Sequence, residues 1–368
     1  MEVPPRKSLR AVMPFAPDKP SELVRRELGL KEVVRLCSNE SSLGPSPKAL
    51  AAYHKAAEGL SCYPDGGSPS LRSALARHYK LRPENIIVGS GSDELIRLCC
   101  EAFLDVDDEV MVSQYAFIRF RQQAAVMGAR LIEIPMTDWT HDLETMGRAA
   151  NPRTKILFVA SPNNPTGTYN TKAELEDFLL SVPPTTLVVI DEAFYDYARE
   201  NDDYPGTVPG LVRKHSNLVV LRTFSQAHGL AGLRVGCAVG DPETLGWLDR
   251  IRLPFNVSLP AQRCAQAALA DKAFLARSVQ TIVRCRESLA AALREMGFGV
   301  MDSAANFLFV RSARVRGRAL SKALLRRGVV IHPLDEYGLA DHVRISVGTP
   351  AQNAALLKGL REILREEP

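Results

Sequence analysis

The sequence has no long hydrophobic run and no large excess of one charge. Its apolar runs, such as residues 187–190 and 218–221, have the length of strands, whereas a membrane span needs about 20 consecutive apolar residues. Lysine and arginine number 46 and aspartate and glutamate 42, which leaves a net charge of +4 on 368 residues. This charge is too small to indicate a nucleic-acid partner. We therefore expect a protein that binds neither membranes nor nucleic acids.

Cysteine is also scarce, and its seven copies are scattered along the chain. No C-x-x-C or H-x-x-x-H pair is present, so the sequence predicts no metal site. The odd number of cysteines and their apolar surroundings predict reduced thiols in a cytoplasmic protein. Prolines and Asp18 interrupt the basic N-terminal segment, and we expect no signal peptide.

Short β-branched runs alternate with segments of helical period between about residues 85 and 240. This alternation is typical of parallel strands joined by crossover helices, and it predicts a doubly wound α/β domain. Helices are expected at residues 92–103 and 117–127. The strands are expected at residues 86–89, 109–112, 130–134, 155–160, 187–191, 218–223 and 235–239.

The pattern changes in the last third of the chain. One long amphipathic helix is expected over residues 261–296, ended by Gly297. Strand-like segments then alternate with helices, which predicts a second, smaller α/β domain. These segments are residues 307–310, 329–331 and 343–347. The predicted organisation is an N-terminal arm and part of the small domain in residues 1–40, a large domain in 41–262 and a small domain in 263–368, with a helix at 21–28 in the arm.

Polar residues follow the predicted strands at several points. Gly89-Ser90-Gly91-Ser92-Asp93 leaves a strand and opens a helix, where free amides and the helix dipole attract an anion. Glu94 stands where a dinucleotide-binding fingerprint has its third glycine. The segment is therefore either an anion-binding turn or a turn in which the glycines serve structure alone.

Three further segments place polar side chains at or just after the ends of predicted strands. Asn164 lies in a rigid Asn-Pro turn after a strand. Asp191 ends an apolar strand, where a carboxylate is costly unless it is paired. Its partner is either a group of the fold itself or a protonated ring nitrogen. Thr223, Ser225 and Arg234 combine two hydroxyls with a guanidinium, as a phosphate site requires.

These segments, in this order, resemble the fold-type I pyridoxal-5′-phosphate (PLP) aminotransferases, and most closely the histidinol-phosphate aminotransferase family. Further matches are residues 36–47, 63–66 and 343–349, so the likeness covers nearly the whole chain. The resemblance implies a large PLP-binding domain with a seven-stranded, mainly parallel sheet, a smaller α/β domain and a homodimer. It also implies amino-group transfer between an anionic amino compound, such as histidinol phosphate or an amino acid, and a 2-oxo acid.

The resemblance also implies roles for single residues. Tyr115 would stack on the pyridine ring, Asn164 would bind the ring hydroxyl, and Asp191 would keep the ring nitrogen protonated. Arg344 would bind the anionic end of the substrate, with Asn306 and His332 close to it. The residues implied to hold the cofactor phosphate are Ser92, Asp93, Thr223, Ser225 and Arg234, together with Tyr63 from the neighbouring subunit.

The sequence departs from the family at the position of its catalytic lysine. The family has Ser-Lys where this chain has Ser225-Gln226, and that lysine forms a Schiff base with the cofactor and moves the substrate proton. Thr223 and Arg234 keep their spacing around it. A carboxamide is neither nucleophilic nor basic. We therefore expect non-covalent PLP binding and a loss of transamination by orders of magnitude.

Three interpretations of Gln226 stay open. It is an introduced substitution that traps a ligand complex, or a natural feature of a regulatory or scaffolding protein that binds PLP or pyridoxamine phosphate, or another base acts. His228 is the nearest candidate base, with a reference pKa of about 6.5, although a packing role is the simpler alternative. Another base would also allow another reaction, such as decarboxylation. A nicotinamide oxidoreductase is a more distant alternative.

Two smaller departures concern the cofactor ring and the substrate. Phe194 stands where many relatives have a tyrosine that binds the ring hydroxyl. His332 stands where histidinol-phosphate enzymes often have a second arginine near the substrate phosphate. The second change makes an ordinary amino acid as plausible a substrate as histidinol phosphate.

Overall fold

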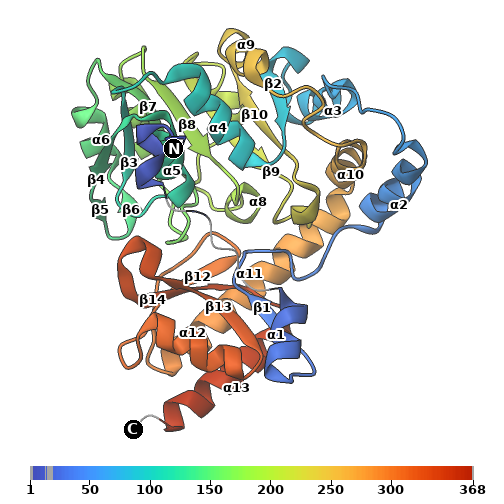
Figure 1. Ribbon diagram of the computed structural model, residues 1–368, viewed down its shortest axis with the longest axis vertical. Coiled ribbons are helices and arrows are strands. Elements are labelled where there is room, and N and C mark those ends of the chain that lie inside the picture. Colours follow the sequence, from blue (N-terminus) through green and yellow to red (C-terminus); the bar gives the residue numbers. More distant parts are fainter. Residues whose placement is uncertain (1–2, 13, 15–19, 367–368) are drawn as a thin grey trace.

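A seven-stranded sheet and a five-stranded sheet organise the chain in the computed structural model, which describes residues 3–12, 14 and 20–366. In Figure 1 the larger sheet lies in the wide upper part and the smaller sheet in the narrow lower part. Each predicted strand of the large sheet is present, displaced by at most one residue at either end.

The large sheet is doubly wound, with the strand order β2-β10-β9-β8-β7-β3-β4. Only β10 runs antiparallel to its neighbours. Every residue of β8 is buried, as expected for a central strand with helices on both faces. The prediction of a mainly parallel sheet is confirmed. The strands are β2 (Ile86–Gly89), β3 (Glu109–Ser113), β4 (Arg130–Ile134), β7 (Thr154–Ala160), β8 (Leu187–Asp191), β9 (Leu218–Thr223) and β10 (Gly236–Gly240).

Two apolar layers cover the faces of this sheet. Leu95, Phe120 and Leu245 represent the helices that pack on one face, and Leu71 and Met146 those on the other. The first group is α4 (Ser92–Phe103), α5 (Ile118–Met127) and α9 (Pro242–Ile251). The second is α2 (Pro47–Ala56), α3 (Pro69–Tyr79), α6 (Leu143–Ala149), α7 (Lys172–Ser181) and α10 (Leu259–Ala270). A short hairpin of β5 (Met136–Thr137) and β6 (Thr140–His141) and the single turn α8 (Tyr195–Ala198) complete this part.

The small sheet combines both ends of the described chain. Its order is β1-β13-β14-β12-β11, and β1 pairs in parallel with β13. Its strands are β1 (Val34–Leu36), β11 (Gly299–Val300), β12 (Phe307–Arg311), β13 (Val329–Leu334) and β14 (Leu339–Ser346). Its helices are α1 (Ser21–Leu28), α12 (Gly317–Arg326) and α13 (Pro350–Glu366). The predicted domain boundaries stay predictions.

Short helical segments connect these elements. The first packs on the large part, because Ser8 Oγ donates to the backbone oxygen of Val126 in α5 at 3.1 Å. Residues 1–2, 13 and 15–19 of the predicted arm lie outside the described residues. The short segments are η1 (Lys7–Ala11), η2 (Ala57–Gly59), η3 (Pro83–Asn85), η4 (Thr207–Leu211), η5 (Ala231–Leu233) and η6 (Asp335–Tyr337).

The prediction of one long helix over residues 261–296 is wrong. Asp271, with φ −93° and ψ 61°, separates α10 from α11 (Lys272–Glu295). Its carboxylate lies 3.5 Å from the Lys48 ammonium. Aspartate is unfavourable in the interior of a helix because its side chain hydrogen-bonds the backbone in non-helical conformations. α10 packs on α2 and α3, whereas α11 packs on α13 and β12 in the lower part. The apolar period continues across Asp271, so it does not reveal the break.

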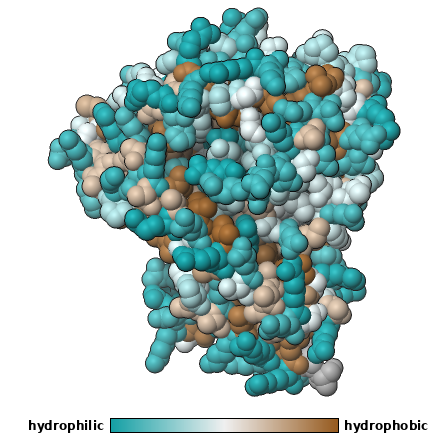
Figure 2. All heavy atoms as spheres, turned by 180° about the vertical axis from the view of Figure 1, so that it is seen from behind, coloured by the Kyte–Doolittle hydropathy of each residue, from teal (hydrophilic) through white to brown (hydrophobic). Residues whose placement is uncertain are grey.

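The surface, the helices and the cysteines show several further features. Seen from behind, the molecule is mostly hydrophilic, and hydrophobic residues gather near the waist between the two parts (Figure 2). Within residues 3–12, 14 and 20–366, no helix has the length and apolar character to cross a membrane. The same residues contain no cluster of three or more potential metal ligands. All seven cysteines are free thiols, and only Cys62 is exposed.

Candidate functional site

A cavity of about 160 Å³ lies where three neighbouring parallel strands end. β7 ends at Ala160, β8 at Asp191 and β9 at Thr223, and α4 begins beside them. Ligands of open α/β sheets bind at this edge. Eight of the residues singled out from the sequence line the cavity: Ser92, Asp93, Asp191, Phe194, Thr223, Ser225, Gln226 and Arg234.

One end of the cavity is suited to a phosphate. Thr223 Oγ1 and Ser225 Oγ lie 3.0 Å apart, and Arg234 Nη1 donates to Ser225 Oγ at 3.4 Å. α4 begins at Ser92 with no side-chain cap on its amides. Hydroxyls, a guanidinium and uncapped helix amides together form an anion site.

Gly91 keeps this end open. Its φ is +80°, and a Cβ built on it would lie 2.5 Å from Arg234 Nη2. A side chain at position 91 would therefore meet the guanidinium and strain the backbone. Only glycine fits this turn and leaves room beside Arg234, as the close approach of a phosphate requires.

The Asp191 carboxylate occupies another part of the cavity wall. It is buried, and its Oδ1 accepts a hydrogen bond from the Ala193 amide at 3.0 Å. Burial raises the pKa of Asp191 to about 7, and the neighbouring Asp93 and Glu192 carboxylates also raise it. A buried acid of this kind becomes a stable anion when a cation lies beside it. A protonated ring nitrogen supplies such a cation, so the residues present fit a PLP-type cofactor.

Gln226 lies in the same wall, directly after Ser225. Its Oε1 is buried, and no hydrogen-bond donor is within reach of this atom in the described part of the chain. The backbone oxygen accepts from the Gly229 amide at 2.9 Å and closes a tight turn. The carboxamide is thus held in the cavity wall without a polar partner for its oxygen.

The predicted substrate residues form a second polar group beside the small sheet. Arg344 Nη1 donates to Asn164 Oδ1 at 2.6 Å, and Nη2 donates to the backbone oxygen of Cys37 at 2.7 Å. His332 is paired with Arg344 across β13 and β14, and its Nε2 lies 3.1 Å from Glu336 Oε1. These residues lie outside the lining of the first cavity.

Two other predicted residues also lie away from the cavity lining. Asn306 is buried, and its Nδ2 donates to the backbone oxygen of Asn39 at 2.9 Å. Tyr63 is 83% exposed and stacks on Phe255 with 4.8 Å between ring centroids. Asn306 therefore holds the backbone of the segment that follows β1, whereas the Tyr63 ring lies on the surface.

The aromatic residue predicted to stack on the pyridine ring lies outside the cavity lining, and another aromatic residue is part of that lining. Tyr115 packs on Trp139, with 5.3 Å between their centroids, and is not part of the cavity lining. Phe117 lines the cavity instead. Sequence reasoning missed Phe117 and also Ser38, although Phe117 directly precedes α5 at the edge of the sheet. That position was the available signal.

His228 faces a different cavity of about 190 Å³ on the other side of β9. The imidazole is buried against Phe224, and its Nε2 lies 3.8 Å from Asp196 Oδ2. Burial lowers its pKa. Because this side chain is outside the cavity that Gln226 lines, the structure does not support His228 as a substitute base, and a packing role describes its surroundings.

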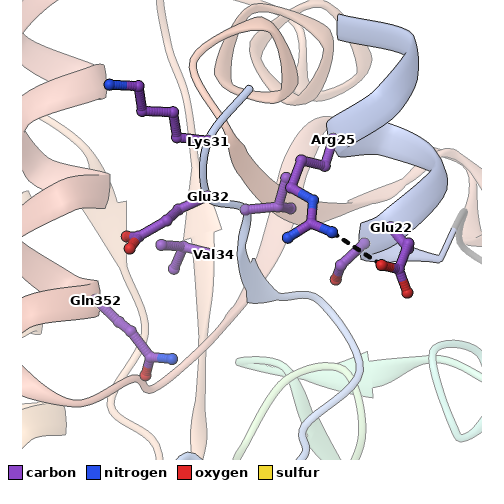
Figure 3. Close-up of a pocket in the computed structure, with 8 residues that line it drawn as sticks. Glu22, Arg25, Lys31, Glu32, Val34 and Gln352 are labelled. Atoms are coloured by element: carbon purple, nitrogen blue, oxygen red, sulfur yellow. Dashed lines mark hydrogen bonds and ion pairs between the residues drawn. The ribbon is translucent and has the colours of Figure 1, made fainter. Parts of the chain in front are cut away.

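A wider hollow of about 430 Å³ lies far from this edge, in the lower part of the molecule. Figure 3 shows Glu22 and Arg25 of α1 on one side, joined at 2.8 Å, with Lys31, Glu32 and Val34 opposite and Gln352 of α13 below. Its lining is of mixed charge and includes no predicted site residue among those described. The wider hollow is therefore not part of the candidate site.

Comparison with known proteins supports the family that the sequence resembles, along nearly the whole chain. Residues 31–360 match the family described as aminotransferase class I and II. The histidinol-phosphate aminotransferase of Moorella thermoacetica is 40% identical over 359 residues, which cover 98% of this chain and 92% of that protein. The corresponding Anaeromyxobacter sp. protein is 42% identical over 365 residues, with 98% and 99% covered.

A solved structure agrees in fold. The crystal structure of histidinol-phosphate aminotransferase from Sinorhizobium meliloti in complex with PLP has a TM-score of 0.86 and 30% identity, and the match covers 98% of this chain and 97% of that one. The predicted fold-type I architecture, a large α/β domain and a smaller one, is confirmed. This chain is a member of the class I and II aminotransferase family.

Proposed function

We propose that this chain binds PLP non-covalently in a site built for amino-group transfer of the histidinol-phosphate aminotransferase type. The substrates would be an anionic amino compound and a 2-oxo acid. The observation that carries the proposal is the pairing, within one cavity, of the buried Asp191 carboxylate with the hydroxyl and guanidinium cup of Thr223, Ser225 and Arg234. These groups match the two charged ends of one phosphorylated pyridine.

Each group has a definite task in this proposal. When bound, PLP supplies an electron sink that stabilises a substrate carbanion. Asp191 holds the proton on the ring nitrogen, and the cup binds the phosphate. Arg344 binds the anionic end of the substrate, next to Asn164. Gln226 can orient a ligand by hydrogen bonding but cannot take up a proton, which costs about 100- to 10,000-fold in rate.

The acids and bases in the lining favour a binder with little turnover as the second candidate function. Within the described lining, the only carboxylates are Asp93 and Asp191, and neither lysine nor histidine is present. Asp93 lies 3.2 Å from Arg119 and 3.5 Å from Arg234, so both guanidiniums engage its carboxylate. No uncommitted base remains in this wall to replace the family's lysine.

Titration with PLP tests the binding itself. We expect saturable changes in the PLP absorbance spectrum, complete loss of the ligand on dialysis, and no added mass after borohydride treatment. Pyridoxamine phosphate should bind as well, since it has the same phosphate and ring nitrogen. A protein with no affinity for any vitamin B6 phosphate would overturn the proposal.

Gly91→Ala tests the phosphate end. The added Cβ would meet Arg234 Nη2, so we expect the PLP dissociation constant to rise at least about tenfold. Gly297→Ala is the matched control, because Gly297 has a φ of +85° but a Cβ added there would have no atom within 4 Å. Both variants should lose about 1–2 kcal/mol of stability, and only the first should lose affinity. Equal affinities would contradict the assignment of this cradle.

We infer that the chain forms a homodimer through the surface around Tyr63. Four exposed hydrophobic residues support this: Leu60, Tyr63, Leu253 and Phe255, which are 45–83% exposed. Tyr63 stacks on Phe255, so the two segments form one surface. Exposed apolar patches of this kind mark association sites. In the proposed dimer, Tyr63 reaches the phosphate bound by the other subunit.

Phe255→Asp is expected to dissociate this dimer. A charge placed in an apolar contact is costly to bury, so the dimer dissociation constant should rise at least about 100-fold. Analytical ultracentrifugation across protein concentrations measures the change. Leu180→Asp, at a residue that is 78% exposed on α7, should leave the mass unchanged. A parent chain that sediments as a monomer at all concentrations would refute the dimer.

A further inference from the structure

A buried ion pair lies behind the cavity, on the opposite face of the large sheet. Arg222 donates through Nε at 2.9 Å and through Nη2 at 2.7 Å to Glu192 Oε2. The Glu192 side chain is fully buried and the Arg222 side chain is 8% exposed. Neither residue lines the 160 Å³ cavity that holds Asp191; both line the cavity of about 190 Å³ that His228 faces, and Thr223 lines both cavities.

The pair joins the two strand ends that carry these cavity residues. Glu192 follows Asp191 at the end of β8, and Arg222 precedes Thr223 at the end of β9. Asp191 is in register with Leu221, and the Glu192 amide donates to the Leu221 oxygen at 2.9 Å. Successive side chains of a strand point to opposite faces. Asp191 and Thr223 therefore face the cavity while their neighbours are paired behind them.

Other groups hold this pair in one geometry. Thr207 Oγ1 donates to Glu192 Oε1 at 2.6 Å, so both carboxylate oxygens are engaged. The Arg222 guanidinium carbon lies 3.4 Å from the ring centre of Tyr195 and 5.0 Å from that of Tyr79. A planar guanidinium that is stacked and doubly bonded has little freedom. The two strand ends are thus fixed relative to each other.

Stability alone gives a weak reason for such a pair. Burying two charges costs much of what their attraction returns, and apolar residues of similar volume often replace buried pairs without loss of stability. A fixed distance between two functional groups is a different benefit, because a misplacement of 1 Å can cost about 100-fold in function.

We propose that Glu192 and Arg222 are positioning residues, whose ion pair sets the distance between the ring-nitrogen site at Asp191 and the phosphate site at Thr223. This inference rests on the proposed binding of a vitamin B6 phosphate. The vitamin B6 phosphate would be bound at both its ring nitrogen and its phosphate only while the Glu192–Arg222 pair is intact.

The double variant Glu192→Gln/Arg222→Met separates positioning from stability. It removes both charges while keeping similar volumes and an acceptor for Thr207. We expect Glu192→Gln alone, which leaves a buried cation, to lower the unfolding midpoint, and the double variant to recover it. The PLP dissociation constant should stay raised about 10- to 100-fold in both. A merely structural pair predicts instead that affinity recovers together with the midpoint.

A spectroscopic measurement reports on the ring end directly. The ¹⁵N chemical shift of PLP labelled at the pyridine nitrogen should indicate a protonated ring in the parent and a partly deprotonated ring in the double variant at the same pH. Glu109→Gln is the matched control, because Glu109 is a buried, ion-paired carboxylate at the start of β3, at the opposite edge of the sheet. It should lower stability with little effect on PLP affinity.

A milder variant tests the same inference if the double variant does not fold. Thr207→Val removes one hydrogen bond to Glu192 and leaves both charges, and it should weaken PLP binding about threefold to tenfold. Normal PLP affinity and an unchanged ¹⁵N shift in a folded double variant, or in Thr207→Val, would overturn the inference alone. A parent that binds no vitamin B6 phosphate would overturn it together with the proposed function.

Discussion

Gln226→Lys is expected to convert this chain into a protein that bonds PLP covalently and transfers amino groups about 100 to 10,000 times faster than the parent. The new ammonium would lie in the wall of the cavity, after Ser225 and close to the Thr223 and Arg234 cup. Lysine supplies both a nucleophile and a base, which the carboxamide does not. Intact mass after borohydride treatment measures the bond. Turnover with a panel of amino donors, histidinol phosphate included, measures the rate.

Two controls make this result specific. Gln226→Arg places a cation at the same position without a nucleophilic amine, so it should gain neither the adduct nor the rate. Carbon dioxide release with the same donors would reveal decarboxylation instead of amino transfer. If Gln226→Lys forms the adduct but accelerates no donor, the site is not a disabled transaminase, and the binder with little turnover becomes the better account.

Asp191→Asn is expected to change stability and cofactor affinity in opposite directions. Burial raises the pKa of Asp191 from 3.8 to about 7, so the folded state holds this proton more tightly than the unfolded chain. Between pH 3.8 and pH 7 the free energy of unfolding therefore falls as pH rises. Above pH 7 the ionised, buried carboxylate has its full destabilising cost. This difference in pKa corresponds to on the order of 4 kcal/mol.

Asparagine removes that cost and also removes the partner of the ring nitrogen. At pH 8 we expect the ligand-free variant to be more stable than the parent and to bind PLP about 10- to 100-fold more weakly. Urea unfolding from pH 4 to 8, with and without PLP, measures both effects. Asp142→Asn is a control of opposite sign, because hydrogen bonds from Thr145 lower the pKa of Asp142. The stability from Asp142 is lost as pH falls. A destabilised Asp191→Asn variant at pH 8 would contradict the proposed environment.

The strand ends at the cavity could be predicted because local pattern decides them. β7, β8 and β9 each contain a continuous buried apolar run, and a polar residue directly follows each run. The runs are residues 156–160, 187–190 and 218–221. The phosphate cup could be predicted for a related reason, since Thr223, Ser225 and Arg234 lie close together in the chain and their spacing carries the information. The break at Asp271 could not, because an apolar period continues through a single non-helical residue.

Contacts between distant segments were beyond local pattern. Nothing near Tyr115 indicates that Trp139 covers it and that Phe117 takes the place in the cavity wall. The neighbours of Arg344 likewise depend on how the two sheets meet, because Asn164 comes from the large part and Cys37 from the segment after β1. The two alternatives for His228 could not be separated either, because a tight turn decides which face of β9 the side chain reaches.

The parallel pairing of β1 with β13 has a consequence for how the protein is made. Val34 lies beside Val329, so β1 cannot pair until β13, which follows the whole seven-stranded core in the chain, has been made. Ser38, only two residues beyond β1, lines the cavity. We expect the seven-stranded core to fold during synthesis, since its strands are contiguous in the chain. The cavity wall then closes only when β13 has been made and β1 joins it.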